Sequence, residues 1–231
     1  MTQPEAVEGL ARHLTRLPHR QVLAEDVYET VKALIMDHVI TPGARLNIDG
    51  LARELLVSQT PIREALARLE SDGLVTKTAL RGYSVVPLLS RKELQDLFGF
   101  RQLIEPWAAA TAATRADAAA IHALQVELAS VAAVPEGSQY EIYKAMAAHD
   151  SRFHDLVLVT AGNDAVRAAF ERTHCHLHMF RLHYASGIAG QAVREHRRVA
   201  GAIASGDPVA SRAAMRAHLK ASLSRLNKVY Q

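Results

Sequence analysis

The sequence of 231 residues contains a single cysteine, Cys175, so it cannot form an internal disulfide framework. It has no apolar run close to the roughly 18 residues that a membrane-spanning helix needs. Residues 1–8 are polar and lack the basic start and apolar stretch of a signal peptide. These absences predict a soluble, cytoplasmic protein.

Aromatic residues and net charge are also sparse. Aromatics make up 5% of the chain, whereas alanine, the best helix former, is abundant, which favours a mainly α fold. The formal net charge is only +3. Residues 1–85 contain 10 Lys and Arg against 11 Asp and Glu, so bulk charge does not identify a part that binds nucleic acid. Any attraction to phosphate must come from where individual basic residues are placed.

The N-terminal part of the chain nevertheless has the pattern of a winged helix-turn-helix. Apolar residues recur at helical spacing in three segments, and two short β-type runs follow. Pro42-Gly43 breaks the first helix, Pro61 fits the first turn of the third, and Gly73 ends it. The expected elements are helices over 23–39, 48–55 and 58–72 and strands over 74–78 and 83–86. The expected domains are a flexible tail (1–19), a winged helix-turn-helix domain (20–88) and a helical effector-binding and dimerisation domain (89–231).

In this pattern, the third helix would enter the major groove of DNA with its first residues. Its polar face carries Thr60 and Arg63, and Gln59 lies at its leading end. Arginine can donate two hydrogen bonds to guanine or phosphate, and glutamine can pair with adenine. Arg81, between the two strands, would lie near phosphate or the minor groove. Arg63 and Arg68 taken singly are equally compatible with solvated surface charges, so the indication comes from the whole arrangement.

Residues 58–66 read S-Q-T-P-I-R-E-A-L, and together with the later R-G-Y turn they closely resemble the GntR family of bacterial regulators. The resemblance implies that DNA is contacted by Ser58, Gln59, Thr60, Arg63, Arg81 and Gly82. Two residues depart from the family pattern. Gln59 stands where arginine is usual, which predicts a different base preference. Leu56 stands where glycine is usual, and a left-handed backbone there would cost leucine on the order of 1 kcal/mol.

The rest of the chain is helical in pattern, with breaks at glycine, proline and aspartate positions. Six helices are expected, over 90–115, 117–133, 139–161, 163–186, 190–205 and 208–229. Polar side chains fall on the apolar faces of three of them. Asp150 and His154 lie one turn apart, and His196 and His218 lie on two other helices. Ionised groups that face a core are costly unless they are paired or bound to metal.

Facing helices of a bundle commonly build metal sites, so these four residues are candidate ligands. A single histidine on an apolar face is more often an ordinary core residue. His174, His176 and His178 alternate along the sequence and cannot all face one site on a helix, so we assign them no role.

The segments around Asp150 and His154, E-H-R at 195–197 and R-A-H-L at 216–219 together resemble the FCD effector domain of many FadR-type GntR regulators. The resemblance implies that Asp150, His154, His196 and His218 bind a divalent metal ion. Six helices resemble the VanR-like subgroup. Imidazole and carboxylate ligands suit zinc, nickel, manganese or iron, and spacing does not choose among them.

Arg101 is expected on the inner face of its helix. A bidentate arginine beside a metal with open coordination positions would hold a small carboxylate, the class of effector that the family implies. An internal ion pair with Glu105 is an equal alternative.

The sequence therefore predicts a homodimeric regulator, with repression as the family's usual mode, that binds a palindromic operator in double-stranded DNA. An effector bound near the metal would alter operator affinity, and the operator would alter effector affinity by the same factor. A metal-dependent hydrolase is one alternative, although no general base stands beside the ligands and the DNA-binding head would be unexplained. The other is a DNA-binding protein whose metal is structural and which has no effector.

Overall fold

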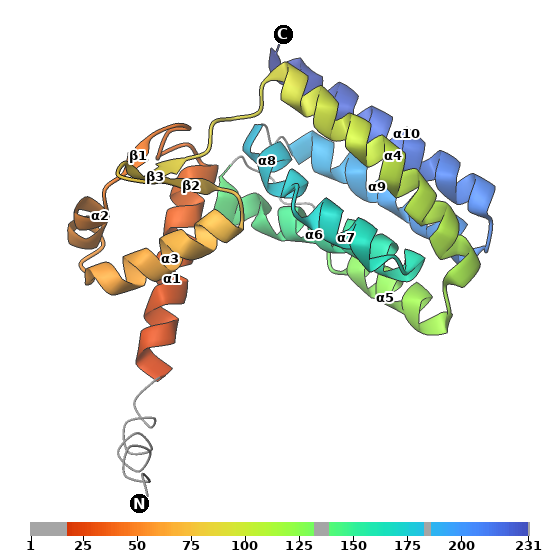
Figure 1. Ribbon diagram of the computed structural model, residues 1–231. Helices are drawn as coiled ribbons and strands as arrows, with labels where there is room; N and C mark the ends of the chain where they lie inside the picture. Colours follow the sequence, from red (N-terminus) through yellow and green to blue (C-terminus); the bar gives the residue numbers. More distant parts are fainter. Residues whose placement is uncertain (1–17, 132–138, 183–185, 231) are drawn as a thin grey trace, which may run out of the picture. The chain divides into compact units, whose positions relative to one another are not determined.

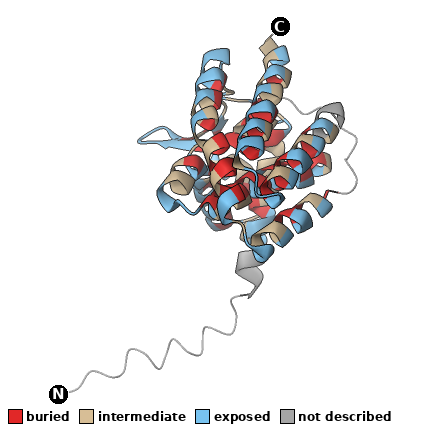
Figure 2. Ribbon diagram, turned by 90° about the vertical axis from the view of Figure 1, so that its right-hand side faces the viewer, coloured by how far each residue is buried: buried red, intermediate tan, exposed pale blue. Residues whose placement is uncertain are grey.

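The structure is a computed structural model that describes residues 18–131, 139–182 and 186–230 (Figure 1). The chain divides into two compact units, the first ending at Pro87 and the second beginning at Leu88. Buried residues lie on the inward faces of the helices and exposed residues on their outward faces (Figure 2). Of the predicted tail, residues 1–17 lie outside the described part of the chain, and the next residues are helical.

The first unit, called the head below, contains three helices and three short strands among its described residues. They are α1 (Pro18–Met36), β1 (Arg45–Leu46), α2 (Ile48–Glu54), α3 (Gln59–Ser71), β2 (Val75–Thr78) and β3 (Gly82–Val85). The strands form an antiparallel sheet in the order β1-β3-β2, in which β2 and β3 make the hairpin of the wing. The predicted winged helix-turn-helix is confirmed. The sequence gives no sign of β1, because two residues are too few to show an alternating pattern.

Helix α3 is held in place by its apolar face. Ile62, Leu66 and Leu69 are fully buried, and α3 packs against α1, where Val31 and Ile35 are also fully buried. Each such side chain contributes about 1.5–3 kcal/mol when it is removed from water. Because this face is anchored in the core, the opposite face of α3 is exposed to solvent.

Two residues of the head have a left-handed backbone that bears on the predictions. His38 has a φ of 57°, so α1 stops at Met36 rather than at the predicted residue 39. Leu56, in the turn between α2 and α3, has a φ of 55° and a side chain that is 92% exposed. The left-handed conformation expected where the family has glycine is therefore present.

The second unit is helical in all its described elements. They are α4 (Arg91–Arg115), α5 (Ala118–Ala129), α6 (Tyr140–Ala161), α7 (Asp164–Glu171), α8 (Cys175–Leu182), α9 (Ser186–Ala204), α10 (Pro208–Leu226) and the short 3-10 helix η2 (Asn227–Tyr230). Helices α4 and α10 lie side by side, and α6 and α9 pack against them (Figure 1). Helix α5 contacts α6 and α9, while α7 and α8 contact α6. The core of this unit thus lies among four long helices.

The prediction of one helix over 163–186 is wrong. Helix α7 ends at Glu171 and α8 begins at Cys175, with His174 between them at a left-handed φ of 45°. Because neither glycine nor proline marks this break, the helical periodicity of the sequence continues across it. The last predicted positions, 183–185, lie outside the described residues. The described part of this unit has seven α-helices, so the expected number of six is also wrong. The assignment to the VanR-like subgroup, which depended on that number, loses its support.

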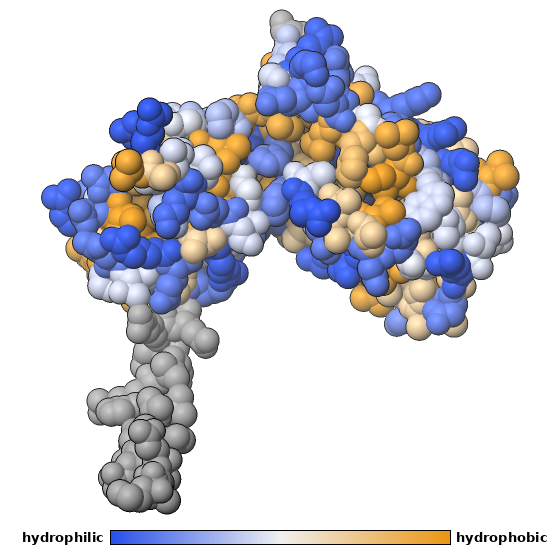
Figure 3. Space-filling model, viewed as in Figure 1, coloured by the Kyte–Doolittle hydropathy of each residue, from blue (hydrophilic) through white to orange (hydrophobic). Residues whose placement is uncertain are grey.

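The other helix boundaries follow the local signals closely. Ser90 and Glu93 form a reciprocal capping box at the start of α4. Gly162 ends α6 with a φ of 69°, and Asp207 caps α10 ahead of a proline in its first turn. Hydrophilic side chains cover much of the surface in the view of Figure 3. Among the described residues, no helix combines the length and apolar character needed to cross a membrane.

Candidate metal centre and DNA-binding face

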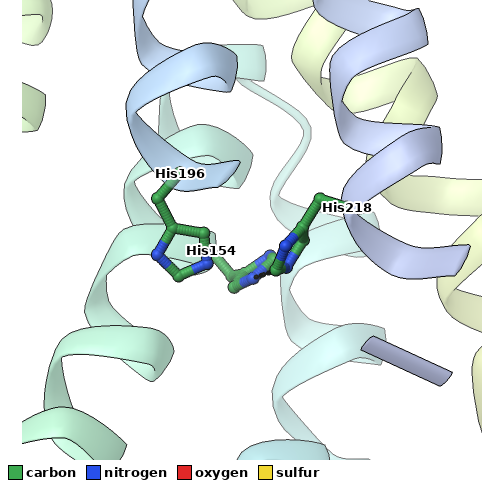
Figure 4. A group of neighbouring side chains, drawn as sticks. All are labelled: His154, His196 and His218. Atoms are coloured by element: carbon green, nitrogen blue, oxygen red, sulfur yellow. Dashed lines mark hydrogen bonds between the residues drawn. The ribbon is translucent and has the colours of Figure 1, made fainter. Parts of the chain in front are cut away.

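Three histidines from three helices meet in the core of the second unit. His154 lies on α6, His196 on α9 and His218 on α10, and their rings point toward one another (Figure 4). One ring nitrogen of each lies within 4.8 Å of the other two. All three side chains are buried, with residue exposures of 1%, 0% and 3%. The structure thus brings together the three histidines that the sequence predicted to converge.

Two of the rings are oriented by carboxylates on their outer side. His154 donates its Nδ1–H to Glu105 of α4, and His218 donates its Nδ1–H to Glu195 of α9 across 2.8 Å. A carboxylate at neutral pH can only accept, so both protons are on Nδ1. In the neutral imidazoles the two Nε2 atoms carry lone pairs, and they face each other at 3.3 Å.

The third ring is oriented in the same sense by another histidine. His149 donates from Nδ1 to Glu127 across 2.9 Å, and its Nε2 lies 3.0 Å from Nδ1 of His196. A neutral His149 that donates from Nδ1 can only accept at Nε2, so His196 donates to it from its own Nδ1, and Nε2 of His196 has no hydrogen-bond partner among the described residues. Inward lone pairs on three neighbouring nitrogens repel one another, and a cation bound between them relieves that repulsion. The donor set fits a divalent metal, since metal-bound histidines usually donate their other N–H to a carboxylate or similar partner.

Asp150 lies at the edge of this group rather than within it. Its Oδ1 is 3.4 Å from Nε2 of His196, while its Oδ2 accepts a hydrogen bond of 2.7 Å from Nδ1 of His176. His176, to which the sequence assigned no role, is thus brought to the predicted ligand by α8. Asp150 is within reach of the centre but is held by His176 in this arrangement.

The protonation states of these groups suit metal binding. Burial lowers the pKa of His154 to about 4, against the opposing effect of Glu105, and burial holds the pKa of His196 well below its usual range. Both imidazoles are therefore neutral at pH 7, the form that a metal ligand needs. Burial alone would raise the pKa of Asp150, but the hydrogen bond and the charge of His176 lower it well below its usual range.

Arg101 forms the internal ion pair that the sequence left open as one of two alternatives. Its side chain is 1% exposed, and its Nε donates to Glu105 across 2.5 Å, so the internal ion pair exists. A second nitrogen of the guanidinium, Nη2, lies 3.4 Å from Nε2 of His154. The third, Nη1, points at the sulfur of Met179 at 3.0 Å. The arginine therefore stands beside the inward histidine nitrogens with its charge partly neutralised by Glu105.

In the head, the first residues of α3 present the predicted polar face to solvent. Ser58, Gln59, Thr60 and Arg63 are all exposed, and the hydroxyl of Ser58 makes no capping bond with the helix. Gln59 donates to Asp49 across 2.5 Å and accepts from Arg63 across 3.1 Å. The residue that departs from the family pattern thus links α2 to the arginine expected to read DNA.

The wing carries its predicted residues at the tip of the β2–β3 hairpin. Arg81 and Gly82 are exposed, and Gly82 has a φ of 77° that favours glycine. Arg68, by contrast, pairs with Glu25 and lies over the ring of Tyr28 at 3.8 Å. Arg68 therefore stabilises the packing of α1 on α3.

Four residues of the centre were not predicted as site residues, and for one of them, Glu127, the sequence carries no signal. Glu105 entered only as a partner of Arg101, whereas Glu127, His149 and Glu195 were not singled out. Glu195 directly precedes a candidate ligand, and His149 directly precedes Asp150. Glu127 gives no signal, because only packing of α5 on α6 brings it to His149.

A winged helix-turn-helix head followed by an all-helical unit is the architecture of a bacterial transcription regulator. The GntR family of bacterial regulatory proteins matches residues 23–85, and the FCD domain matches residues 96–221. The chain belongs to the GntR family and carries an FCD domain. It is a DNA-binding transcription regulator, not an enzyme, as the sequence predicted.

Proteins of known sequence and structure agree with this membership. The chain is 28% identical to the HTH-type transcriptional regulator YdhC of Bacillus subtilis over 74% of this chain and 76% of the relative. It is also 28% identical to the regulator Rv0494 of Mycobacterium tuberculosis over 93% of each chain. Among solved structures, E. coli McbR/YncC has a TM-score of 0.66 at 19% identity, covering 90% of this chain and 99% of its own. A GntR regulator from Rhodococcus has a TM-score of 0.65 at 20% identity over 90% and 99%. These two likenesses concern the fold.

Proposed function

We propose that this protein is an effector-controlled repressor in the cytoplasm whose operator affinity is set by a small organic acid bound beside a divalent metal ion. The observation that carries the proposal is the set of three inward Nε2 lone pairs on His154, His196 and His218. These nitrogens would hold the ion, with Asp150 as the neighbouring carboxylate. When bound, the metal supplies a Lewis-acidic centre with open positions for a carboxylate.

Arg101 supports the choice of an organic acid as effector. Its Nη2 lies 3.4 Å from Nε2 of His154, so an anion that binds beside these nitrogens meets a guanidinium. Charge-assisted bonds from arginine to carboxylate are among the stronger hydrogen bonds in proteins. Because Arg101 already pairs with Glu105, an incoming acid would share or take its partner. That change would alter side-chain contacts of α4, which carries both residues, and thereby the packing of the helices against it.

The head would read a palindromic operator as part of a homodimer. Ser58, Gln59, Thr60, Arg63, Arg81 and Gly82 are the proposed DNA contacts, supported by their exposure on one face of α3 and at the wing. Residues 20–88 would form this DNA-binding domain and residues 89–231 the effector-binding and dimerisation domain.

Duplexes selected from a random pool by the full-length protein allow the proposal to be tested. Operator affinity should be measured by fluorescence anisotropy with zinc, nickel or manganese, with and without a panel of small carboxylates. At least one acid should change the affinity in the metal-loaded protein, and the change should disappear after chelation. Metal binding without a response to any acid would favour a structural metal. No binding of any divalent ion would overturn the metal centre itself.

A further inference from the structure

Each of the three histidines is backed by an arginine–glutamate pair. Arg101 pairs with Glu105 at 2.5 Å, Arg152 with Glu127 at 2.8 and 3.0 Å, and Arg225 with Glu195 at 2.7 and 2.9 Å. Each glutamate also accepts an N–H from an imidazole. The six side chains come from five different helices, so the repetition does not result from one local motif. Each arginine keeps its glutamate ionised and oriented toward the histidine.

His196 differs from the other two because an imidazole stands between it and its glutamate. His149 is 0% exposed, its Nδ1 is 2.9 Å from Glu127, and its Nε2 is 3.0 Å from Nδ1 of His196. Both nitrogens of His149 are therefore occupied, so His149 does not offer a ligand atom. Because its Nδ1–H is held by Glu127, His149 offers its Nε2 as the acceptor for His196, in the place that a glutamate takes for the other two histidines.

We propose that His149 is a positioning residue that fixes the Nδ1–H tautomer of His196, with Glu127 and Arg152 setting its own tautomer. The inference rests on the proposed metal function of His196. Without His149, Nδ1 of His196 loses its acceptor, and the carboxylate of Asp150, whose Oδ1 lies 3.4 Å from Nε2, favours the proton on Nε2. A proton on Nε2 blocks the lone pair that a metal requires.

The relay also differs from the other two pairs in its exposure. The side chain of Arg152 is 53% exposed, compared with 11% for Arg225 and 1% for Arg101. Water can replace an exposed guanidinium but cannot replace a buried imidazole. The effect of substitutions should therefore decrease outward, from His149 to Glu127 to Arg152.

The test uses the full chain, labelled with 15N and stripped of metal by a chelator. Long-range 1H–15N spectra report the tautomer of His196, and competition with a chromophoric chelator reports zinc affinity. In the wild type, His196 should carry its proton on Nδ1. His149→Phe should move that proton to Nε2 and lower zinc affinity about 10–100-fold, the usual effect of losing such a partner. Arg152→Gln should have a much smaller effect on both readouts.

Phe153→Leu is the matched control. Phe153 stacks on His196 with ring centroids 4.1 Å apart but makes no hydrogen bond to it, so its loss disturbs packing alone. This variant should keep the Nδ1–H tautomer. If His149→Phe does not fold, Glu127→Leu, which removes the acceptor at the outer end of the relay, takes its place.

The outcomes separate the two proposals. A wild type with the proton of His196 on Nε2 overturns the positioning role, and so does a His149→Phe variant with unchanged tautomer and zinc affinity. A wild type that binds no zinc, nickel or manganese overturns the metal function. In that case the tautomer spectra still decide whether His149 orients His196.

Discussion

Replacing Leu56 with glycine should stabilise the head even though it removes an apolar side chain. The side chain is 92% exposed, so almost no burial is lost. The φ of 55° costs an L-residue roughly 1–2 kcal/mol, a penalty that glycine escapes. The greater freedom of glycine in the unfolded chain offsets about 0.5–1 kcal/mol of this gain. The expected net stabilisation is about 0.5–1 kcal/mol.

Scanning calorimetry of the full chain measures this effect in the transition of the head. For a domain of this size, the gain corresponds to a rise in Tm of about 2–8 °C. Leu56→Ala is the control, because alanine loses the same side chain but keeps the Cβ that makes the left-handed backbone costly. Its Tm should stay close to that of the wild type. A glycine variant no more stable than the alanine variant would refute the reasoning, since the backbone would then carry no strain.

Three further predictions concern DNA binding and pH. Arg63→Ala should weaken operator binding by roughly 1–3 kcal/mol at matched salt, measured by anisotropy; an unchanged affinity would contradict its place in the recognition helix. Gln59→Ala removes the bridge between Asp49 and Arg63 and should weaken binding by about 0.5–1.5 kcal/mol, with a smaller loss in an Arg63→Ala background, where only the direct contact of Gln59 with DNA is removed. Because the pKa of His154 is about 4 in the fold and near 6.5 when unfolded, its contribution to the stability of the metal-free protein is complete above about pH 6.5 and is lost as the pH falls to about 4. The urea concentration at the unfolding midpoint should therefore fall as the pH is lowered across this range, and this fall should be smaller in His154→Gln. An equally steep fall in that variant would contradict the assignment of the effect to His154.

Local chemistry explains which parts of the fold the sequence could predict. Capping residues, prolines and glycines placed most helix ends within a few residues, and the family's usual glycine at the position of Leu56 marked a turn whose backbone is left-handed in the structure. The break at His174 could not be predicted, because its turn has neither glycine nor proline and its apolar spacing continues across it.

The candidate site shows the same division. His154, His196 and His218 could be selected because polar side chains on apolar helix faces are conspicuous in a sequence. Their partners could not, since Glu127 reaches the site only through the packing of α5 on α6. His176 could not be selected from the sequence, because three alternating histidines cannot all face one site on a helix and nothing marks which of them does; in the structure His176 hydrogen-bonds to Asp150.

The most direct test of the metal centre is elemental analysis of purified wild-type protein and of His196→Ala. The wild type should contain a stoichiometric divalent ion, and the variant should lose it while its head still binds operator DNA. Full metal occupancy in His196→Ala would contradict the assignment of these histidines as ligands.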